Sequence, residues 1–306
     1  MNMTFEKAYL EYLEYAKLRQ KPTSLLTFKN KMEKNFLPYF KKKKIKHFKI
    51  EDYAKWQSEI TKLGYSYTYR RNLHYCVCSI YEFLMNFYNV KKNIPKIVGN
   101  FKDDYYSTPK VDFWTYEEYK KFIQKVDNIV FYTIFELLYF TGCRKGEALA
   151  LTFNDIEDDQ ITINKTISKE RFNGKRIIMN PKTKKSIRKI QIDSKLKENI
   201  KKLQEYYISC YGYFSKDFYI FGGIKPLSTT TLERKKNEYC ELAEVKKIRI
   251  HDFRHSHATL LYNLNIPIDV ISKRLGHSSI TTTLNVYIHG NDEQEKRAIQ
   301  LLSSMK

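Results

Sequence analysis

The spacing of apolar residues changes character once along this chain of 306 residues. Over the first ninety residues, apolar side chains recur every three or four positions, which is the spacing of helices with one buried face. The stretch 91–112 loses that periodicity and holds Pro95, Gly99 and Pro109, as a connecting segment does. The sequence therefore predicts this division: a helical domain at 1–90, a linker at 91–110, a second domain at 111–290 and a tail helix at 291–306.

Helices account for the whole of the first domain. The pattern predicts four of them, at about 5–16, 24–36, 51–63 and 67–88. Thr4 is placed to cap the first helix, Pro38 follows the end of the second and Gly64 follows the end of the third. Each boundary is thus marked by a residue type that starts or stops a helix.

The second domain mixes helix with strand. Thr115 and Glu118 form a capping box that opens a helix. From 160 to 192, isoleucines recur at strand spacing, and Asn173-Gly174 is a two-residue hairpin signal between the first two β runs. The expected fold class is therefore mainly α with one small antiparallel β-sheet, that is, an α+β second domain.

The chain is strongly basic, with 55 Lys and Arg against 34 Asp and Glu and a formal net charge of +21. Such an excess indicates a polyanionic partner, most commonly nucleic acid. A codon pool biased toward A+T is the competing explanation, although it does not account for the shortage of acidic residues. No apolar run approaches the ~18 residues that span a bilayer, and Glu6 and Lys7 argue against a signal peptide. The five cysteines form no CxxC pair, so we expect an intracellular, reducing location.

Four places in the second domain hold residues suited to proton transfer or anion binding. Arg144 directly follows a glycine turn at a predicted helix start, where backbone N–H groups also point outward. His251 and Arg254 are three residues apart, so on a helix they share a face and bring an imidazole beside a fixed cation. His277 follows a helix-ending glycine, and Tyr287 ends a short helix. Taken singly, each has an ordinary structural explanation.

Metal binding is the alternative at the histidine-rich stretch. His255 and His257 lie beside the pair just named, but residues two apart on a helix point in different directions. No cysteine or carboxylate set completes a site with them. We therefore expect no metal there.

Together and in this order, these places match the motifs of a known family. The segments TGCRKGEALAL, PKTKKSIRKI, HDFRHSHATLL and RLGHSSITTTLNVYIH resemble those of the tyrosine recombinases, and of phage and conjugative-element integrases in particular. The resemblance covers roughly residues 110–290, while residues 1–90 resemble more loosely the family's helical, SAM-like core-site-binding domain. It implies these catalytic residues: Arg144, Lys182, His251, Arg254, His277 and Tyr287.

Two neighbours of this set need comment. Lys184 and Lys185 lie in the same turn as Lys182, so a shift of strand register would change the choice of lysine. Glu147 matches a family acidic residue that supports the site without being catalytic. Many integrases carry a further arm-binding domain ahead of the core-binding helices with which this sequence begins, so arm-site binding stays open.

The resemblance also implies a reaction and its partners. A tyrosine oxygen attacks a DNA phosphate, expels a 5′-hydroxyl and leaves a 3′-phosphotyrosyl bond, which keeps the bond energy so that no nucleotide cofactor is needed. Two arginines stabilise the phosphoryl oxygens, so no metal is implied either. The expected partner is double-stranded DNA with inverted core sites, held in a C-shaped clamp by the two domains. A homo-tetramer on two sites, accessory DNA-bending or directionality factors and a cytoplasmic, nucleoid-associated location follow; no membrane is implied.

Three other functions compete with integration and excision of a mobile element. A type IB topoisomerase uses a similar site, but it would carry different N-terminal domains. A non-catalytic DNA-binding regulator would explain the charge, but it would not explain six site residues in order. A cellular, Xer-like chromosome-dimer resolvase shares both the size and the chemistry.

Overall fold

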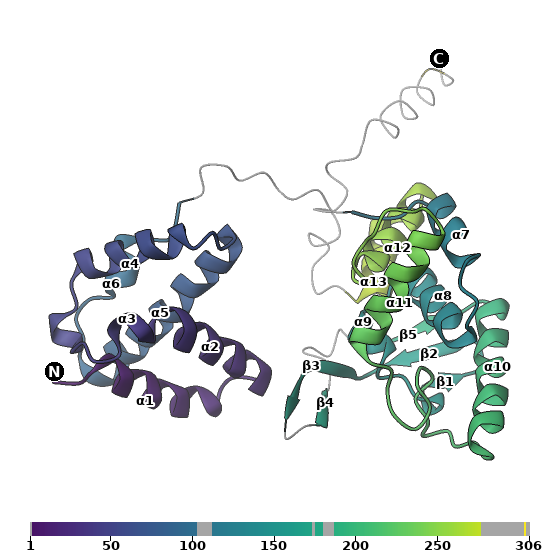
Figure 1. Cartoon of the computed structure of the whole chain (residues 1–306), viewed down its shortest axis with the longest axis horizontal. Helices are drawn as coiled ribbons and strands as arrows, with labels where there is room; N and C mark the ends of the chain where they lie inside the picture. Colours follow the sequence, from purple (N-terminus) through teal and green to yellow (C-terminus); the bar gives the residue numbers. More distant parts are fainter. Residues whose placement is uncertain (1, 103–111, 173–174, 180–186, 277–302, 304–306) are drawn as a thin grey trace. The chain divides into compact units, whose positions relative to one another are not determined.

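The computed structural model describes residues 2–102, 112–172, 175–179, 187–276 and 303. The chain divides into two compact units, Met1–Thr108 and Pro109–Lys306. Each has its own hydrophobic core; Figure 1 colours the first unit purple to blue and the second from teal to yellow. Within the described residues, no helix combines the length and the apolar character needed to cross a membrane.

The first unit is built from helices around an aromatic core. They are α1 (Phe5–Lys17), α2 (Pro22–Asn35), α3 (Leu37–Phe40), the 3-10 turn η1 (Ile45–His47), α4 (Ile50–Lys62), α5 (Tyr67–Tyr88) and α6 (Ile94–Val98). Thr4 caps α1 as predicted, because its side chain accepts a hydrogen bond from the backbone N–H of Lys7. At the centre, the ring of Phe36 lies 4.8 Å from that of Phe5 and 5.0 Å from that of Trp56.

Two prolines begin helices where the sequence analysis did not place a start. α2 begins at Pro22 rather than at Ser24. Pro38 lies in the first turn of α3, so it follows the end of α2 as predicted but also opens the next helix. Proline suits the first turn because its missing N–H would have no helical partner there.

The linker predicted at 91–110 is too long at its start. Asn93 caps the short helix α6, and Gly99 ends it with a φ of 87°. α6 packs against α4 and α5, and Phe101 is buried with its ring 6.0 Å from that of Trp56. Proline and glycine here begin and end a helical turn, a role that composition does not distinguish from that of a linker.

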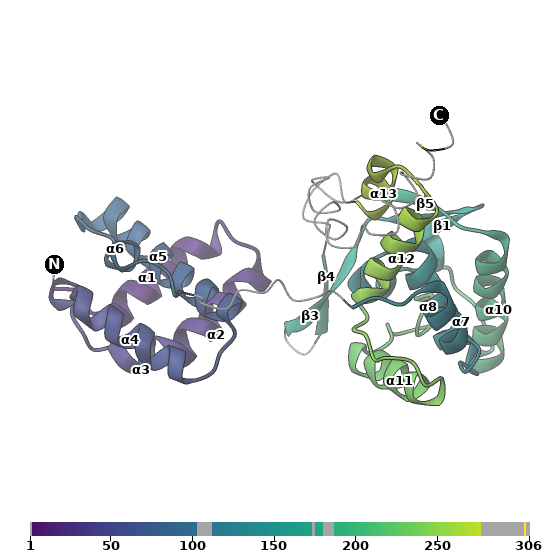
Figure 2. The same cartoon turned by 90° about the horizontal axis from the view of Figure 1, so that it is seen from above.

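The second unit combines helices with small antiparallel sheets. Its helices are α7 (Tyr116–Ile123), α8 (Ile129–Thr141), α9 (Lys145–Ala148), the 3-10 turn η2 (Phe153–Asp155), α10 (Ser194–Tyr211), α11 (Thr229–Leu242), α12 (Asp252–Asn263) and α13 (Ile268–Leu275). The predicted capping box is present at the start of α7, where Thr115 and Glu118 bond each other's backbone N–H groups. α8 packs against α10, α12 and α9 (Figure 2), which is why its sequence is apolar on nearly all sides.

The strands form two sheets instead of the single sheet predicted. They are β1 (Ile156–Glu157), β2 (Gln160–Ile163), β3 (Thr166–Phe172), β4 (Lys175–Met179) and β5 (Arg188–Gln191). β2 lies between β1 and β5, with Ile161 opposite Ile190, and both side chains are buried. Because β1 and β5 take both edges of β2, β3 and β4 pair with each other. The predicted hairpin turn, Asn173-Gly174, lies outside the described residues.

Trp114 fastens the start of the second unit to its interior. Its backbone N–H donates to Oγ of Ser256 at 2.9 Å, and its indole Nε1 donates to the carbonyl of Lys246 at 2.8 Å. The indole lies 5.0 Å from the ring of Phe253, which is in the first turn of α12. The side chain is 1% exposed, so this attachment is part of the core.

Candidate active site

Arg144 lies at the start of α9, as the sequence predicts. α8 ends at Thr141, and the chain then turns at Gly142, whose φ is 63°. A Cβ at that position would lie 2.6 Å from Cδ2 of Leu275, so both the backbone conformation and the available space require glycine. Arg144 follows as the N-cap of α9 with its side chain 38% exposed. The turn therefore presents a guanidinium group to solvent at a helix N-terminus.

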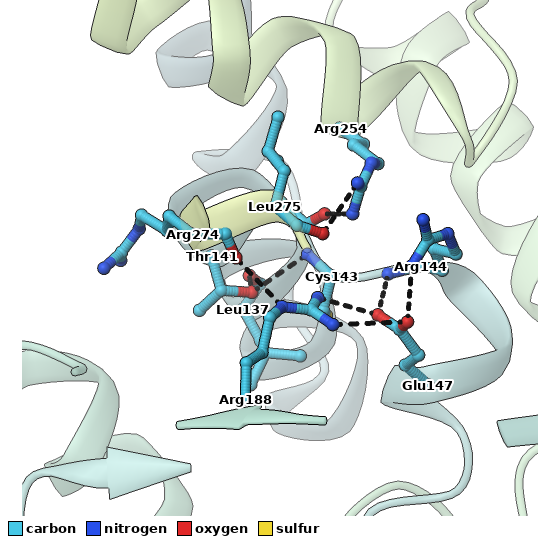
Figure 3. Close-up of polar contacts among 10 residues, drawn as sticks. Leu137, Thr141, Cys143, Arg144, Glu147, Arg188, Arg254, Arg274 and Leu275 are labelled. Atoms are coloured by element: carbon cyan, nitrogen blue, oxygen red, sulfur yellow. Dashed lines mark hydrogen bonds and ion pairs between the residues drawn. The ribbon is translucent and has the colours of Figure 1, made fainter. Parts of the chain in front are cut away.

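Glu147 joins Arg144 to a second arginine (Figure 3). Its Oε2 accepts from the backbone N–H of Arg144 at 2.8 Å, and its Oε1 accepts from Nη1 of the same residue at 2.8 Å. Nη2 of Arg188 donates to Oε2 at 2.9 Å. Burial alone would raise the pKa of Glu147, but the hydrogen bond and charge of Arg188, together with Arg144, hold that pKa below its ordinary value. The carboxylate is thus ionised at neutral pH and shared between two cations.

Arg254 extends from the first turn of α12 and is 3% exposed. Its Nη1 donates to the carbonyl of Gly142 at 3.0 Å and its Nη2 to the carbonyl of Leu275 at 2.7 Å, so it connects the end of α8 with the end of α13. Burial lowers the pKa of Arg254 to about 9, and the positive charges of Arg144 and Arg188 add to this effect. The group is still charged at pH 7, in surroundings that lack negative charge.

His251 is the N-cap residue of α12 and remains exposed to solvent. Its ring meets that of His255 edge to face at 5.3 Å. Desolvation by the surrounding protein, followed by the charges of His255 and Arg254, lowers the pKa of His251. A neutral imidazole that can accept a proton at pH 7 is the result. In the described parts of the chain, no group of three His, Cys, Asp or Glu side chains is arranged to hold a metal ion.

Three of the six predicted catalytic residues, Lys182, His277 and Tyr287, lie outside the described residues, as do the alternatives Lys184 and Lys185. The predicted tail helix lies outside them too, apart from one residue. The strand that follows the three lysines and the helix that precedes the histidine are both described. Both contribute contacts to the arginine network.

Two arginines in that network are not singled out by the sequence analysis. Arg188 opens β5 on the same face as the buried Ile190. A charged residue on the buried face of a strand requires a buried partner, and this alternation is the signal that could have found it. Arg274, in the last turn of α13, donates to the carbonyl of Phe140 at 3.0 Å and to Nε2 of His257 at 3.3 Å. We find no sequence pattern that points to it.

Two family models match the chain. The model of the phage integrase family matches residues 112–294, and the model of the phage integrase N-terminal SAM-like domain matches residues 4–61. The ICEBs1 integrase of Bacillus subtilis strain 168 is 32% identical over 304 residues, an alignment that covers 96% of this chain and 81% of that relative.

Two further proteins extend the comparison. A protein named tyrosine recombinase XerC-like, from Caldanaerobacter subterraneus, is 28% identical over 214 residues, which cover 64% of this chain and 55% of that relative. Among solved structures, the Tn1549 transposon integrase in complex with transposon right end DNA superposes with a TM-score of 0.77 at 21% identity. That match covers 98% of this chain and all of the solved one, so the fold is shared over both units.

Proposed function

Since this chain belongs to the phage integrase family of site-specific tyrosine recombinases, we propose that it cuts and rejoins DNA during the integration and excision of a mobile genetic element. The relative that aligns over nearly the whole chain is an integrase. The XerC-like relative aligns over a smaller share at lower identity. This difference favours a mobile element over the Xer-like role of resolving chromosome dimers.

The observation that carries the proposal is an excess of positive charge built around one carboxylate. Glu147 serves both Arg144 and Arg188, and the charges of those two arginines lower the pKa of Arg254. Three guanidinium groups against one carboxylate leave two positive charges in excess. A DNA phosphate supplies one negative charge, and its transition state carries more. The cluster is therefore suited to hold a phosphoryl group during a displacement at phosphorus.

In the proposed reaction, Oη of Tyr287 attacks the phosphorus atom of one phosphodiester. The bond from phosphorus to the 5′ oxygen breaks, and a 3′-phosphotyrosyl bond remains. Arg144 offers accessible N–H donors to the non-bridging oxygens, and Arg254 adds charge from a buried position. Attack by the free 5′-hydroxyl of a second strand reverses the step and rejoins the DNA.

Two protons move in this step. His251 takes the proton of the Tyr287 phenol, because its lowered pKa keeps the imidazole neutral at pH 7. A phenol has a pKa near ~10 and is a weak nucleophile without such help. Lys182 gives a proton to the leaving 5′ oxygen, and His277 completes the cationic pocket. These three assignments rest on the motif resemblance.

The same proposal covers partners and location. The two units clamp double-stranded DNA at inverted core sites, and four copies of the chain act on two sites with accessory DNA-bending or directionality factors. The net charge of +21 supports a polyanionic partner. The protein works in the cytoplasm, on the nucleoid.

A nicked duplex made from the attachment site at the element's ends tests the nucleophile. We expect the native protein to form a covalent adduct that resists denaturant, is linked through a 3′-phosphate and needs neither Mg²⁺ nor ATP. Tyr287→Phe removes only the reacting oxygen, so it should bind the duplex and form no adduct. Tyr213→Phe, at an exposed tyrosine, is the matched control and should react normally.

Each outcome has a definite meaning. Adduct formation by Tyr287→Phe, or peptide mapping that places the DNA on another residue such as Tyr262, would contradict the choice of nucleophile. Failure of the native protein to form any adduct on its own attachment site would contradict the function.

A further inference from the structure

One buried arginine outside the predicted catalytic set spans several segments of the site. Arg188 begins β5, and its side chain is 7% exposed. Its two terminal nitrogens face the carboxylate of Glu147, at 2.9 Å from Nη2 to Oε2 and 3.4 Å from Nη1 to Oε1. Its Nε donates to the backbone carbonyl of Arg274 at 2.9 Å. A single planar group therefore joins β5 to α9 and to the end of α13 (Figure 3).

At α9, Arg188 limits how strongly Glu147 can hold Arg144. The carboxylate now bonds the backbone N–H and one terminal nitrogen of Arg144, while Arg188 takes the rest of its accepting capacity. Without Arg188, the buried carboxylate would turn to its remaining cation. Arginine and carboxylate close readily into a two-bond fork. Arg144 would then lose a donor that a phosphate needs.

At α13, Arg188 works beside Arg254. The carbonyls of a last helical turn have no partner within their helix. Arg188 takes one of them, and Arg254 takes that of Leu275. Gly276 ends the helix with a φ of 68°, and a Cβ there would lie 3.1 Å from Cδ of Arg188. The chain continues from this held end directly into His277.

We propose that Arg188 is a positioning residue of the recombination reaction, which keeps Arg144 available to the phosphate and fixes the end of α13. The inference rests on the proposed function and adds a residue to it. Arg188 acts through Glu147 and through a backbone carbonyl, and its nearly complete burial keeps it from the DNA. Its loss should therefore slow strand cleavage and leave DNA affinity almost unchanged.

Three variants separate this role from simple structural support. Arg188→Met keeps the side-chain length and removes the charge and the donors. Arg188→Met combined with Glu147→Gln removes both members of the buried pair, so that no carboxylate is left to capture Arg144. Arg188→Lys keeps the charge, but an ammonium group cannot match the planar fork that reaches Glu147 and the carbonyl together. Thermal unfolding first establishes a temperature at which every variant is folded.

The measurement is single-turnover adduct formation on the nicked duplex, expressed per folded protein, alongside the Kd for one half-site. Arg188→Met should lower the cleavage rate about a hundredfold, the scale for a lost transition-state donor, while Kd changes less than about threefold. The double variant should cleave about tenfold faster than Arg188→Met, because the coupled residue is gone. Arg188→Lys should fold like the native chain and cleave about tenfold slower; it decides the matter if Arg188→Met does not fold.

Cleavage by folded Arg188→Lys and Arg188→Met at the native rate would overturn the proposal, since a purely structural arginine changes stability alone. Equal losses of affinity and of cleavage rate would overturn it too, because Arg188 would then act in DNA binding. An absence of adduct with the native protein contradicts the proposed function itself and is recognised separately, before any variant is compared.

Discussion

Acid should destabilise the second unit through one buried histidine. His257 is 2% exposed, and its Nε2 accepts a hydrogen bond from the cationic Arg274. Burial, together with the adjacent charge of Arg274, lowers the pKa of His257 to about 3. The imidazole is therefore neutral in the folded chain, and an added proton would meet both a desolvated site and a like charge.

The size of the effect follows from the difference between folded and unfolded chains. Between pH 3 and the ordinary pKa of 6.5, the unfolded chain binds a proton at His257 and the folded chain does not. The free energy of unfolding therefore falls as pH falls through this window and is unaffected above it. At pH 5 the gap from the ordinary pKa is about 1.5 units, and at ~1.36 kcal/mol per unit the loss is about 2 kcal/mol. This figure holds for any folded pKa below about 4.

The assay uses a reporter that belongs to the second unit. The chain has two tryptophans, so Trp56→Phe leaves Trp114 as the only one. Urea unfolding at pH 7.5 and 5.0, followed by Trp114 fluorescence, gives the loss of stability on acidification. In His257→Gln, whose amide oxygen can still accept from Arg274, this loss should be smaller by about 2 kcal/mol. His47→Gln, at an exposed histidine of the first unit, is the matched control.

The comparison between variants removes the contribution of other groups. Glu147 and Asp252 have lowered pKa values, so their stabilisation fades as pH falls further, but it does so equally in each variant. If His257→Gln and His47→Gln lose the same stability between the two pH values, His257 takes up its proton in the folded chain and the reasoning is refuted.

Two substitutions probe the backbone around α8, both measured by the free energy of unfolding in urea. Gly142→Ala should cost about 3 kcal/mol, because a left-handed alanine costs ~1 and the clash with Leu275 about 2 more; Gly64→Ala, also left-handed but with no described atom within 4 Å of the added carbon, should cost only about 1, and equal losses would contradict the packing argument. Asn128→Ala removes the acceptor for two backbone N–H groups at the start of α8 and should cost about 1 kcal/mol; no loss would show that water replaces the cap.

Local signals in the sequence predict the helices and the place of Arg144 well. α5 begins and ends where the pattern predicts, because Ser66 caps its start and Asn89 ends it in a left-handed conformation. The position of Arg144 at a helix start likewise follows from the glycine two residues earlier. Such features depend on neighbours within a few positions, which a single sequence displays.

Long-range contacts are the part that the sequence does not reveal. The bonds of Arg188 reach Glu147, 41 positions away, and Arg274, 86 positions away. Nothing local distinguishes it from an exposed arginine except the strand alternation. The division of the strands into two sheets was missed for the same reason, since it depends on β5 returning to pair with β2.

Trp114 fixes the point at which the chain enters the second unit, on the helix that carries Arg254. The number of residues ahead of Trp114 therefore determines the span available between the two units, and the fold of the second unit does not depend on it. Doubling the length of a flexible connection costs only ~0.6 kcal/mol. An insertion or deletion ahead of Trp114 would thus change how far apart two segments of one double helix can be reached, while Arg254 and its neighbours keep their places.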